Sequence, residues 1–227
     1  ELAAYVWDKR HEFHYTGLTA EPEEALNMAL SQEKGPVFIT DSGDNVTSGA
    51  TGWNTYILRQ VLRVENLQKK VLFASICDPK CYESLKETEI GSKADITLGV
   101  DHDAMSAPVK LSVVVKSKGD VVRAGTMGSA ILKLYGHCVT VNVENTGIDI
   151  VVASSEKTFS SRTVFERAGV DWNDYDITVV KQGYIFPELK EAAAFYVMSL
   201  TDGATPQNTA AIPFKRIMRP MYPVDNI

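Results

Sequence analysis

The polar residues best placed for chemistry lie in the glycine-rich loop, DSGDNVTSGATGWNT at 41–55. The loop follows the short apolar run PVFIT, which we interpret as a buried strand, and precedes a helical apolar pattern. Asp41, Asp44 and Asn45 crowd the end of that strand, and Gly49 frees the backbone. Because ligands of open α/β sheets bind at the carboxyl ends of the strands, we expect these residues to contact a bound small molecule.

The two loop carboxylates have two possible roles. Asp41 and Asp44 could bind a hydrated cation, orient a histidine or accept a hydrogen bond from a ligand amide. Aspartates also commonly accept hydrogen bonds from loop amides and cap the helix that follows. Residue type alone leaves both interpretations open.

A second polar turn follows another predicted strand, in the sequence KQGY at 181–184. Lys181 could bind a carboxylate or stabilise an oxyanion, and Tyr184 could stack or donate a hydrogen bond. Alternatively, Lys181 pairs with Asp41 or Asp44 and closes the glycine-rich loop. If the two strands are neighbours, both turns line the same edge of the sheet.

One histidine lies between carboxylates, in Asp101–His102–Asp103. Its imidazole could ligate zinc while a carboxylate holds the second ring nitrogen. Three adjacent residues cannot all face one ion, so this cluster alone falls short of a zinc site. The alternative is an exposed loop whose acids keep His102 protonated.

The remaining histidines and the cysteines give weaker signals. His11 and His14 have no third ligand near them in sequence, so we interpret them as a solvated helix face. Cys77, Cys81 and Cys138 cannot all pair within the chain, which fits a reducing cytoplasm and ordinary packing cysteines.

Composition limits the classes of partner. The chain has 227 residues, of which 44% are hydrophobic, enough for one domain or one domain with an appendage. A net charge of −6 argues against nucleic acid and anionic membranes. No apolar run approaches the ~20 residues that a membrane-spanning helix needs.

Hydrophobic periodicity predicts an α/β fold: a mixed sheet with flanking helices and an antiparallel β-meander in the middle of the chain. The meander is predicted from a hairpin turning at Lys118–Gly119–Asp120 and from further strands separated by Gly136 and by Asn145–Thr146–Gly147. A proline-spaced tail after residue 205 is expected to be extended and to wrap the domain. The predicted helices are 1–13, 22–32, 54–67, one from Asp78–Pro79, 161–168 and 187–196; the predicted strands outside the meander are 37–40, 70–77, 94–100, 176–181 and 197–201.

Several segments together resemble the C-terminal domain of the MlrC (microcystinase) family of zinc metallopeptidases. The resemblance runs from residue 36 to the end, so we predict this domain at 36–227. Residues 1–35 are then a helical connecting segment from a missing N-terminal domain, as Glu1 inside an apparent helix suggests. The matching segments are PVFITDSGDNVTSGATGW, DHD at 101–103, GTMG at 125–128, GIDIVVASS at 147–155, VVKQGYIFPELKE at 179–191 and FKRIMRPMYPVD at 214–225.

The resemblance implies one domain of a cytoplasmic, zinc-dependent amide or peptide hydrolase. The metal ligands of this hydrolase would lie mainly in the absent N-terminal domain. That domain would be the partner of the present one in an inter-domain active site, and the fragment alone would be inactive. The resemblance makes His102 and Asp103 candidates for substrate contact, beside the loop residues, Lys181 and Tyr184, and assigns no catalytic or metal residue here. Peptide or amide small molecules would be substrates, and a homo-oligomer is possible.

Two departures from the family pattern bear on substrate choice. Ile185–Phe186–Pro187 stands where many members have His-Phe-Arg, and Trp53 stands where an acid often follows the second loop glycine. Either change could alter substrate choice, so microcystin itself is not assumed to be the substrate. The alternative function is a stand-alone module whose glycine-rich loop binds a small molecule or an anion at a helix N-terminus, although no phosphate-loop lysine follows the glycines.

Overall fold

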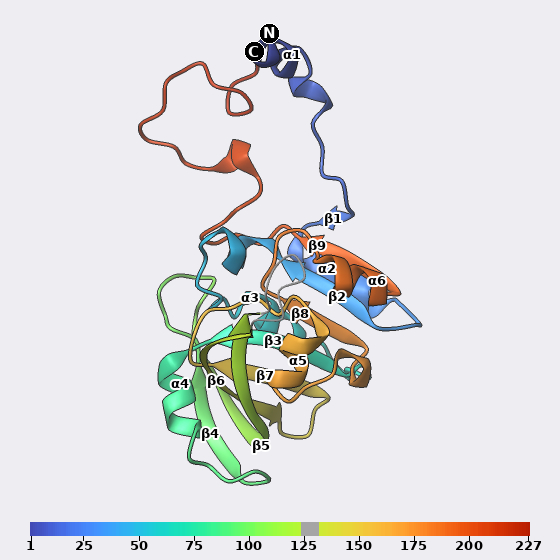
Figure 1. The fold of residues 1–227 in the computed structure, drawn as a ribbon, viewed down its shortest axis with the longest axis vertical. Helices are drawn as coiled ribbons and strands as arrows, with labels where there is room; N and C mark the ends of the chain where they lie inside the picture. Colours follow the sequence, from blue (N-terminus) through green and yellow to red (C-terminus); the bar gives the residue numbers. More distant parts are fainter. Residues whose placement is uncertain (124–131) are drawn as a thin grey trace.

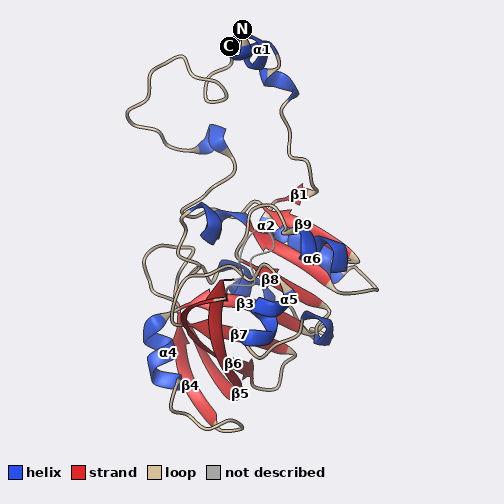
Figure 2. Cartoon of the chain, viewed as in Figure 1, coloured by secondary structure: helices blue, strands red, loops and turns tan. Residues whose placement is uncertain are grey.

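The computed structural model describes residues 1–123 and 132–227, which form a sheet of nine strands with helices on both faces (Figures 1 and 2). The strands lie in the order β1-β9-β2-β8-β3-β7-β6-β5-β4, so neighbours in space are often far apart in sequence. They are β1 (Thr19–Ala20), β2 (Val37–Asp41), β3 (Val71–Cys77), β4 (Lys93–Leu98), β5 (Val109–Arg123), β6 (Lys133–Val143), β7 (Ile148–Ala153), β8 (Ile177–Val180) and β9 (Phe195–Ser199).

The strands from β1 to β7 in this order pair in parallel, and β6, β5 and β4 continue the sheet antiparallel. Every residue of β2, β3, β7 and β8 is buried, as expected for parallel strands covered on both faces. The predicted mixed α/β sheet with an antiparallel meander is therefore confirmed.

Strand alternation sends successive side chains into two separate cores. Val37 and Ile39 face one core with helices α2 (Pro22–Leu30), α3 (Tyr56–Val61) and α4 (Pro79–Leu85). Phe38 faces the other with α5 (Arg162–Arg167) and α6 (Pro187–Ala192). The helix predicted at 54–67 is shorter in the structure, where α3 ends at Val61. The chain then turns at Asn66, where φ is +53°.

The predicted hairpin turn at Lys118–Gly119–Asp120 is wrong, because β5 runs straight through it and pairs with β6. Gly119 lies in mid-strand because α5 ends directly over it: a Cβ there would lie 2.5 Å from the carbonyl carbon of Ala168. The glycine therefore marks a close approach of backbone, not a turn. Strand β6 likewise continues through Gly136, whereas the turn predicted at 145–147 is present. The GTMG segment at 125–128 lies outside the described residues.

The two chain ends lie together, away from the sheet (Figure 1). The predicted helix at 1–13 divides into α1 (Leu2–Asp8) and a 3₁₀ turn at Arg10–Glu12. Arg10 Nε donates to the carbonyl of Ile227 at 3.0 Å, and Tyr15 Oη donates to that of Gln207 at 2.9 Å. The tail therefore does not wrap the domain as expected; its end contacts the segment that follows α1.

Within the predicted connecting segment 1–35, the part from residue 19 packs into the main body. Strand β1 pairs with β9, and Ala25, Leu26 and Ala29 of α2 lie in the same core as β2. Its link to a further domain stays a prediction. No helix in the described part of the chain combines the length and the apolar character needed to cross a membrane.

Candidate functional site

The site is built where three neighbouring parallel strands end. Strand β2 pairs with β8 on one side and with β9 on the other. Asp41 is the last residue of β2, Lys181 follows β8 and Thr201 follows β9. Because parallel strands present their carboxyl ends at one edge, the glycine-rich loop meets the turns after β8 and β9 there.

Lys181 joins the two loop carboxylates in a buried cluster. Its Nζ lies 2.8 Å from Asp41 Oδ2 and 3.0 Å from Asp44 Oδ2, and it donates to the carbonyl of Asn54 at 2.6 Å. The exposed fractions of Lys181, Asp41 and Asp44 are 3%, 0% and 1%. The alternative in which Lys181 closes the glycine-rich loop is therefore the arrangement in the structure.

Two opposing effects act on the pKa of Lys181. Burial lowers this pKa, since a charged ammonium loses its hydration, but the carboxylates of Asp41 and Asp44 raise it by more. The net direction is upward, so Lys181 stays protonated at neutral pH. Its proton is held by the cluster, which makes the amine a fixed cation, not a base.

Asp44 also organises the backbone of the glycine-rich loop. Its Oδ1 accepts from the amide of Gly52 at 2.9 Å, and its Oδ2 accepts from the amide of Asn54 at 2.8 Å. These amides lie just before α3, where an anion would bind if the loop were an anion site. An internal carboxylate already satisfies them.

Asn45 and Gly49 shape the middle of the same loop. The Asn45 side chain accepts from the amide of Thr47 at 3.0 Å and donates to Ser48 Oγ at 2.9 Å, which holds a 3₁₀ turn at Val46–Ser48. Asn45 is buried, and the exposed Gly49 ends the turn with φ +101°. Gly49, together with the exposed Thr47 and Ser48, is thus a part of the loop that a ligand can approach.

The segment after β9 anchors the loop, and the sequence interpretation missed it. Thr201 Oγ1 donates to Asp41 and accepts from the amide of Gly43 at 3.0 Å. Thr205 Oγ1 donates to the carbonyl of Ser42 at 2.8 Å. The available signal was the pattern LTDGATP at the end of a predicted strand, the same strand-end pattern that marks the other two turns.

The structure brings His102 to the glycine-rich loop. The His102 ring lies 5.2 Å from the Trp53 ring, centroid to centroid, tilted by 39°. The His102 loop, residues 99–107, is tied to the start of α3, because Thr55 Oγ1 donates to the carbonyl of Ala107 at 2.6 Å. The Thr55 amide donates to the carbonyl of Met105 at 2.9 Å. Trp53, a departure from the family pattern, is therefore the partner of His102.

Asp103 serves its own loop. Its Oδ1 accepts from the amides of Met105 and Ser106, each at 2.9 Å, and from the Ser106 hydroxyl at 3.0 Å. Partial burial raises the pKa of Asp103, but these hydrogen bonds and the charge of His102 lower it by more. The Asp103 carboxylate does not hold a ring nitrogen of His102.

Tyr184 is 53% exposed. It lines a small hollow of about 190 Å³ with residues of the β1–β9–β2 side, including Thr40 and Tyr196.

The predicted site residues thus divide into two groups. Asp41, Asp44, Asn45 and Lys181 are buried, while Gly49, His102, Asp103 and Tyr184 face solvent.

Sequence comparison assigns the chain to a family. The family model described as "MlrC C-terminus" matches residues 39–216. The chain belongs to this family. No curated protein sequence matches it.

The MlrC C-terminus fold is also similar to a crystal structure of a "Putative metallopeptidase" from Mesorhizobium sp. BNC1. The TM-score is 0.80 at 19% sequence identity, and the match covers 100% of this chain. At this identity the likeness shows a shared fold. The present chain spans 44% of the length of that structure.

Among the residues that the structure describes in this MlrC C-terminus chain, no group of three His, Cys, Asp or Glu side chains could hold a metal ion. His11 packs edge-on against Tyr222, with ring centroids 5.1 Å apart. Cys77 and Cys81 are buried, and burial raises the pKa of each thiol to about 12. The cysteines are therefore packing residues, as expected.

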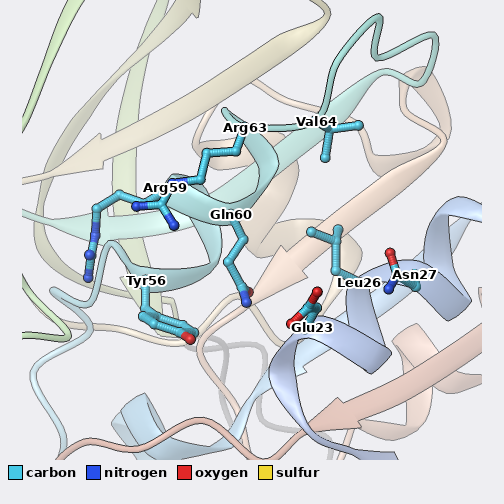
Figure 3. Close-up of a pocket in the computed structure, with 8 residues that line it drawn as sticks. All are labelled: Glu23, Leu26, Asn27, Tyr56, Arg59, Gln60, Arg63 and Val64. Carbon is cyan, nitrogen blue, oxygen red and sulfur yellow. The ribbon is translucent and has the colours of Figure 1, made fainter.

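Two hollows of similar volume flank the MlrC C-terminus core. One, of about 310 Å³, lies between α2 and α3, where Gln60 stands between Tyr56 and Glu23 (Figure 3). None of its lining residues belongs to the turns at the strand ends. The other, of about 320 Å³, is lined in part by Thr47 of the glycine-rich loop and by Phe186, and so adjoins the candidate site.

Proposed function

We propose that this chain is the C-terminal domain of a zinc-dependent amide or peptide hydrolase. It contributes substrate-contacting loops to an active site shared with an N-terminal domain that carries the metal ligands. The observation that carries the proposal is the family match over 39–216, in a fold that makes up 44% of a longer protein named as a putative metallopeptidase.

The geometry favours a role for this domain in shaping the substrate-binding loops. The cluster of Lys181, Asp41 and Asp44 has almost no exposed surface, so its members act on a substrate by fixing the shape of the glycine-rich loop. A preorganised loop binds a ligand with less loss of conformational entropy. We propose that direct contacts come from the exposed residues Gly49, His102, Asp103 and Tyr184.

The described residues do not fit a zinc site. Structural and catalytic zinc sites need at least three protein ligands, and the described part of the chain brings no such group together. The proposed metal ligands therefore belong to the N-terminal domain. Buried, free cysteines are consistent with the proposed reducing cytoplasm.

The alternative of a stand-alone anion-binding module is less well supported. An anion at the start of α3 would need the loop amides that Asp44 already occupies. It would also bring a second negative charge next to a buried carboxylate, which costs free energy unless a cation compensates both. Lys181 is already shared between two carboxylates.

Zinc content and hydrolysis, measured together, test the proposal. We expect no stoichiometric zinc by elemental analysis, and no cleavage of a mixed peptide library, for the 227-residue chain. The protein that also carries the N-terminal domain should bind zinc and cleave peptides, and a chelator should abolish cleavage. One tightly held zinc per 227-residue chain, lost in His102→Ala, would overturn the division of roles.

A further inference from the structure

The hollow next to the glycine-rich loop is unusual for an acidic chain because its wall is basic. It has a volume of about 320 Å³ and lies between the glycine-rich loop, the paired strands β5 and β6, and the segment after β7. Arg123 of β5, Tyr135 of β6 and Lys157 line this hollow, and we call these three residues the cationic pocket. The whole chain carries a net charge of −6.

Cations surround the ring of Tyr135. The Nζ of Lys157 lies 4.2 Å from the ring centroid, and that of Lys133 lies 5.1 Å from it. A hydrogen bond with the Arg123 side chain, together with these lysines, lowers the pKa of Tyr135. The arrangement therefore favours negative charge at this point of the surface.

Among the described residues, no carboxylate lies within salt-bridge distance of these cations. Arg123, Lys133 and Lys157 take part in none of the salt bridges between described side chains, although eight other Lys and Arg residues do. Glu156, adjacent to Lys157 in sequence, forms no salt bridge with it, although both side chains are close enough to Cys77 to shift the pKa of that thiol in opposite directions. Unpaired cations in a hollow are a common way to recognise carboxylates.

The hollow also offers neutral contacts. Thr158 and Ser160 place hydroxyl-bearing residues on its wall, and Thr158 Oγ1 is buried without a hydrogen-bond partner among the described atoms. Phe186 and Val122 add apolar surface. A small ligand with a charged end and an aliphatic stem matches this distribution.

We propose that the cationic pocket binds a carboxylate of the substrate, which places the substrates among peptides or amides that carry an acidic group. Assigning this ligand as a substrate rests on the proposed hydrolase function. Val46 and Thr47 line the hollow and belong to the glycine-rich loop, so a carboxylate held here lies against the loop that Lys181 and Asp44 fix. The carboxylate could come from an acidic side chain or from a free peptide C-terminus.

Binding to the 227-residue chain tests the pocket without any need for catalysis. The probes are N-acetyl-glutamate amide for a side-chain carboxylate, N-acetyl-alanine for a terminal one, and neutral N-acetyl-glutamine amide. An NMR titration should show chemical-shift changes at the cationic pocket with at least one acidic probe. The neutral probe should bind about tenfold more weakly, because it cannot form the charge-assisted hydrogen bonds. The acidic probe that binds more tightly identifies the source of the carboxylate.

Variants identify the residues. Arg123→Gln and Lys157→Gln should each weaken binding of the acidic probe several-fold and reduce its salt dependence. Lys110→Gln, a change at an exposed lysine of the same strand β5, is the matched control and should leave binding unchanged. Equal affinity for the acidic and neutral probes, or equal losses in all three variants, would overturn the proposal.

The design separates this inference from the proposed function. If the acidic probe binds, and if the longer protein cleaves acidic peptides with a KM that rises in Arg123→Gln, both the carboxylate site and the hydrolase function hold. If the probe binds as expected but the longer protein cleaves no peptide, the carboxylate site stands and hydrolysis fails. If the longer protein cleaves neutral peptides as well as acidic ones, and Arg123→Gln leaves KM unchanged, the pocket is not a substrate subsite.

Discussion

Lys181 at the end of β8 and Asp41 at the end of the neighbouring strand β2 form a buried ion pair, with Nζ 2.8 Å from Oδ2. The two residues are 140 positions apart in the chain. Asp44 shares the same ammonium group at 3.0 Å, so a single cation balances two carboxylates. The pair therefore joins the glycine-rich loop to the turn after β8.

Removing this cation should be costly. Lys181→Met leaves Asp41 and Asp44 buried beside each other without a counter-charge, and we expect a loss of roughly 3–5 kcal/mol in the free energy of unfolding. Urea denaturation monitored by circular dichroism measures it. Lys80→Met removes an exposed lysine and should change stability by less than about 0.5 kcal/mol. A Lys181→Met variant as stable as the parent would show that the cluster contributes nothing.

Gly43 should tolerate no side chain. A Cβ at this position would lie 2.2 Å from the carbonyl oxygen of Thr201 and 2.3 Å from that of Asp202. Gly43→Ala must therefore separate the glycine-rich loop from the segment after β9, at an expected cost of more than about 2 kcal/mol. At Gly17 the same change meets only a ring carbon of Tyr196 at 3.8 Å, so Gly17→Ala is the control in urea denaturation and should be nearly neutral.

Thr55 should control the mobility of the His102 loop. Thr55→Val removes the hydroxyl that donates to the carbonyl of Ala107 at 2.6 Å and leaves that carbonyl without this donor. We expect a loss of about 1–3 kcal/mol and faster amide hydrogen exchange at residues 101–106. If exchange there stays at the parental rate while global stability falls, Thr55 supports α3 and not the loop.

Asp103 should make stability depend on pH. Its pKa in the folded protein is lowered, so its stabilising effect is complete above the unfolded pKa of about 3.9 and is lost as pH falls through the folded value. Asp103→Asn keeps the shape but removes the charge, and it should cost up to about 1 kcal/mol at pH 7 and almost nothing near pH 2. Asp8→Asn, in exposed α1, should show no such difference. A constant cost at both pH values would remove the carboxylate charge as the cause.

Much of the fold could be predicted because it depends on local patterns. The largely apolar runs of β2 and β3 indicate strands buried on both faces, and Pro22 with two following acids marks the start of α2. Asp78 caps α4 by accepting from the Cys81 amide at 2.9 Å, as its position before Pro79 indicates. These features involve residues within a few positions of one another.

Glycine is the main source of error in the sequence prediction, because the contact that requires a glycine can come from a remote part of the chain. Gly119 was interpreted as a turn residue from its polar neighbours, yet the end of α5, some fifty residues later, excludes a side chain there. The spacing of the prolines predicts a tail that covers the domain, but the tail contacts Arg10, His11 and Tyr15, in the segment after α1.

The sequence by itself determined most strand, loop and helix units outside the meander, the burial of the central strands and the polar residues at their ends. Only the tertiary structure decided which ends meet. Strand order depends on pairing between segments that are more than a hundred residues apart, and no local pattern specifies it. That order places Lys181 and Thr201 on opposite sides of Asp41, buries the three together, and leaves His102 against Trp53 at the surface.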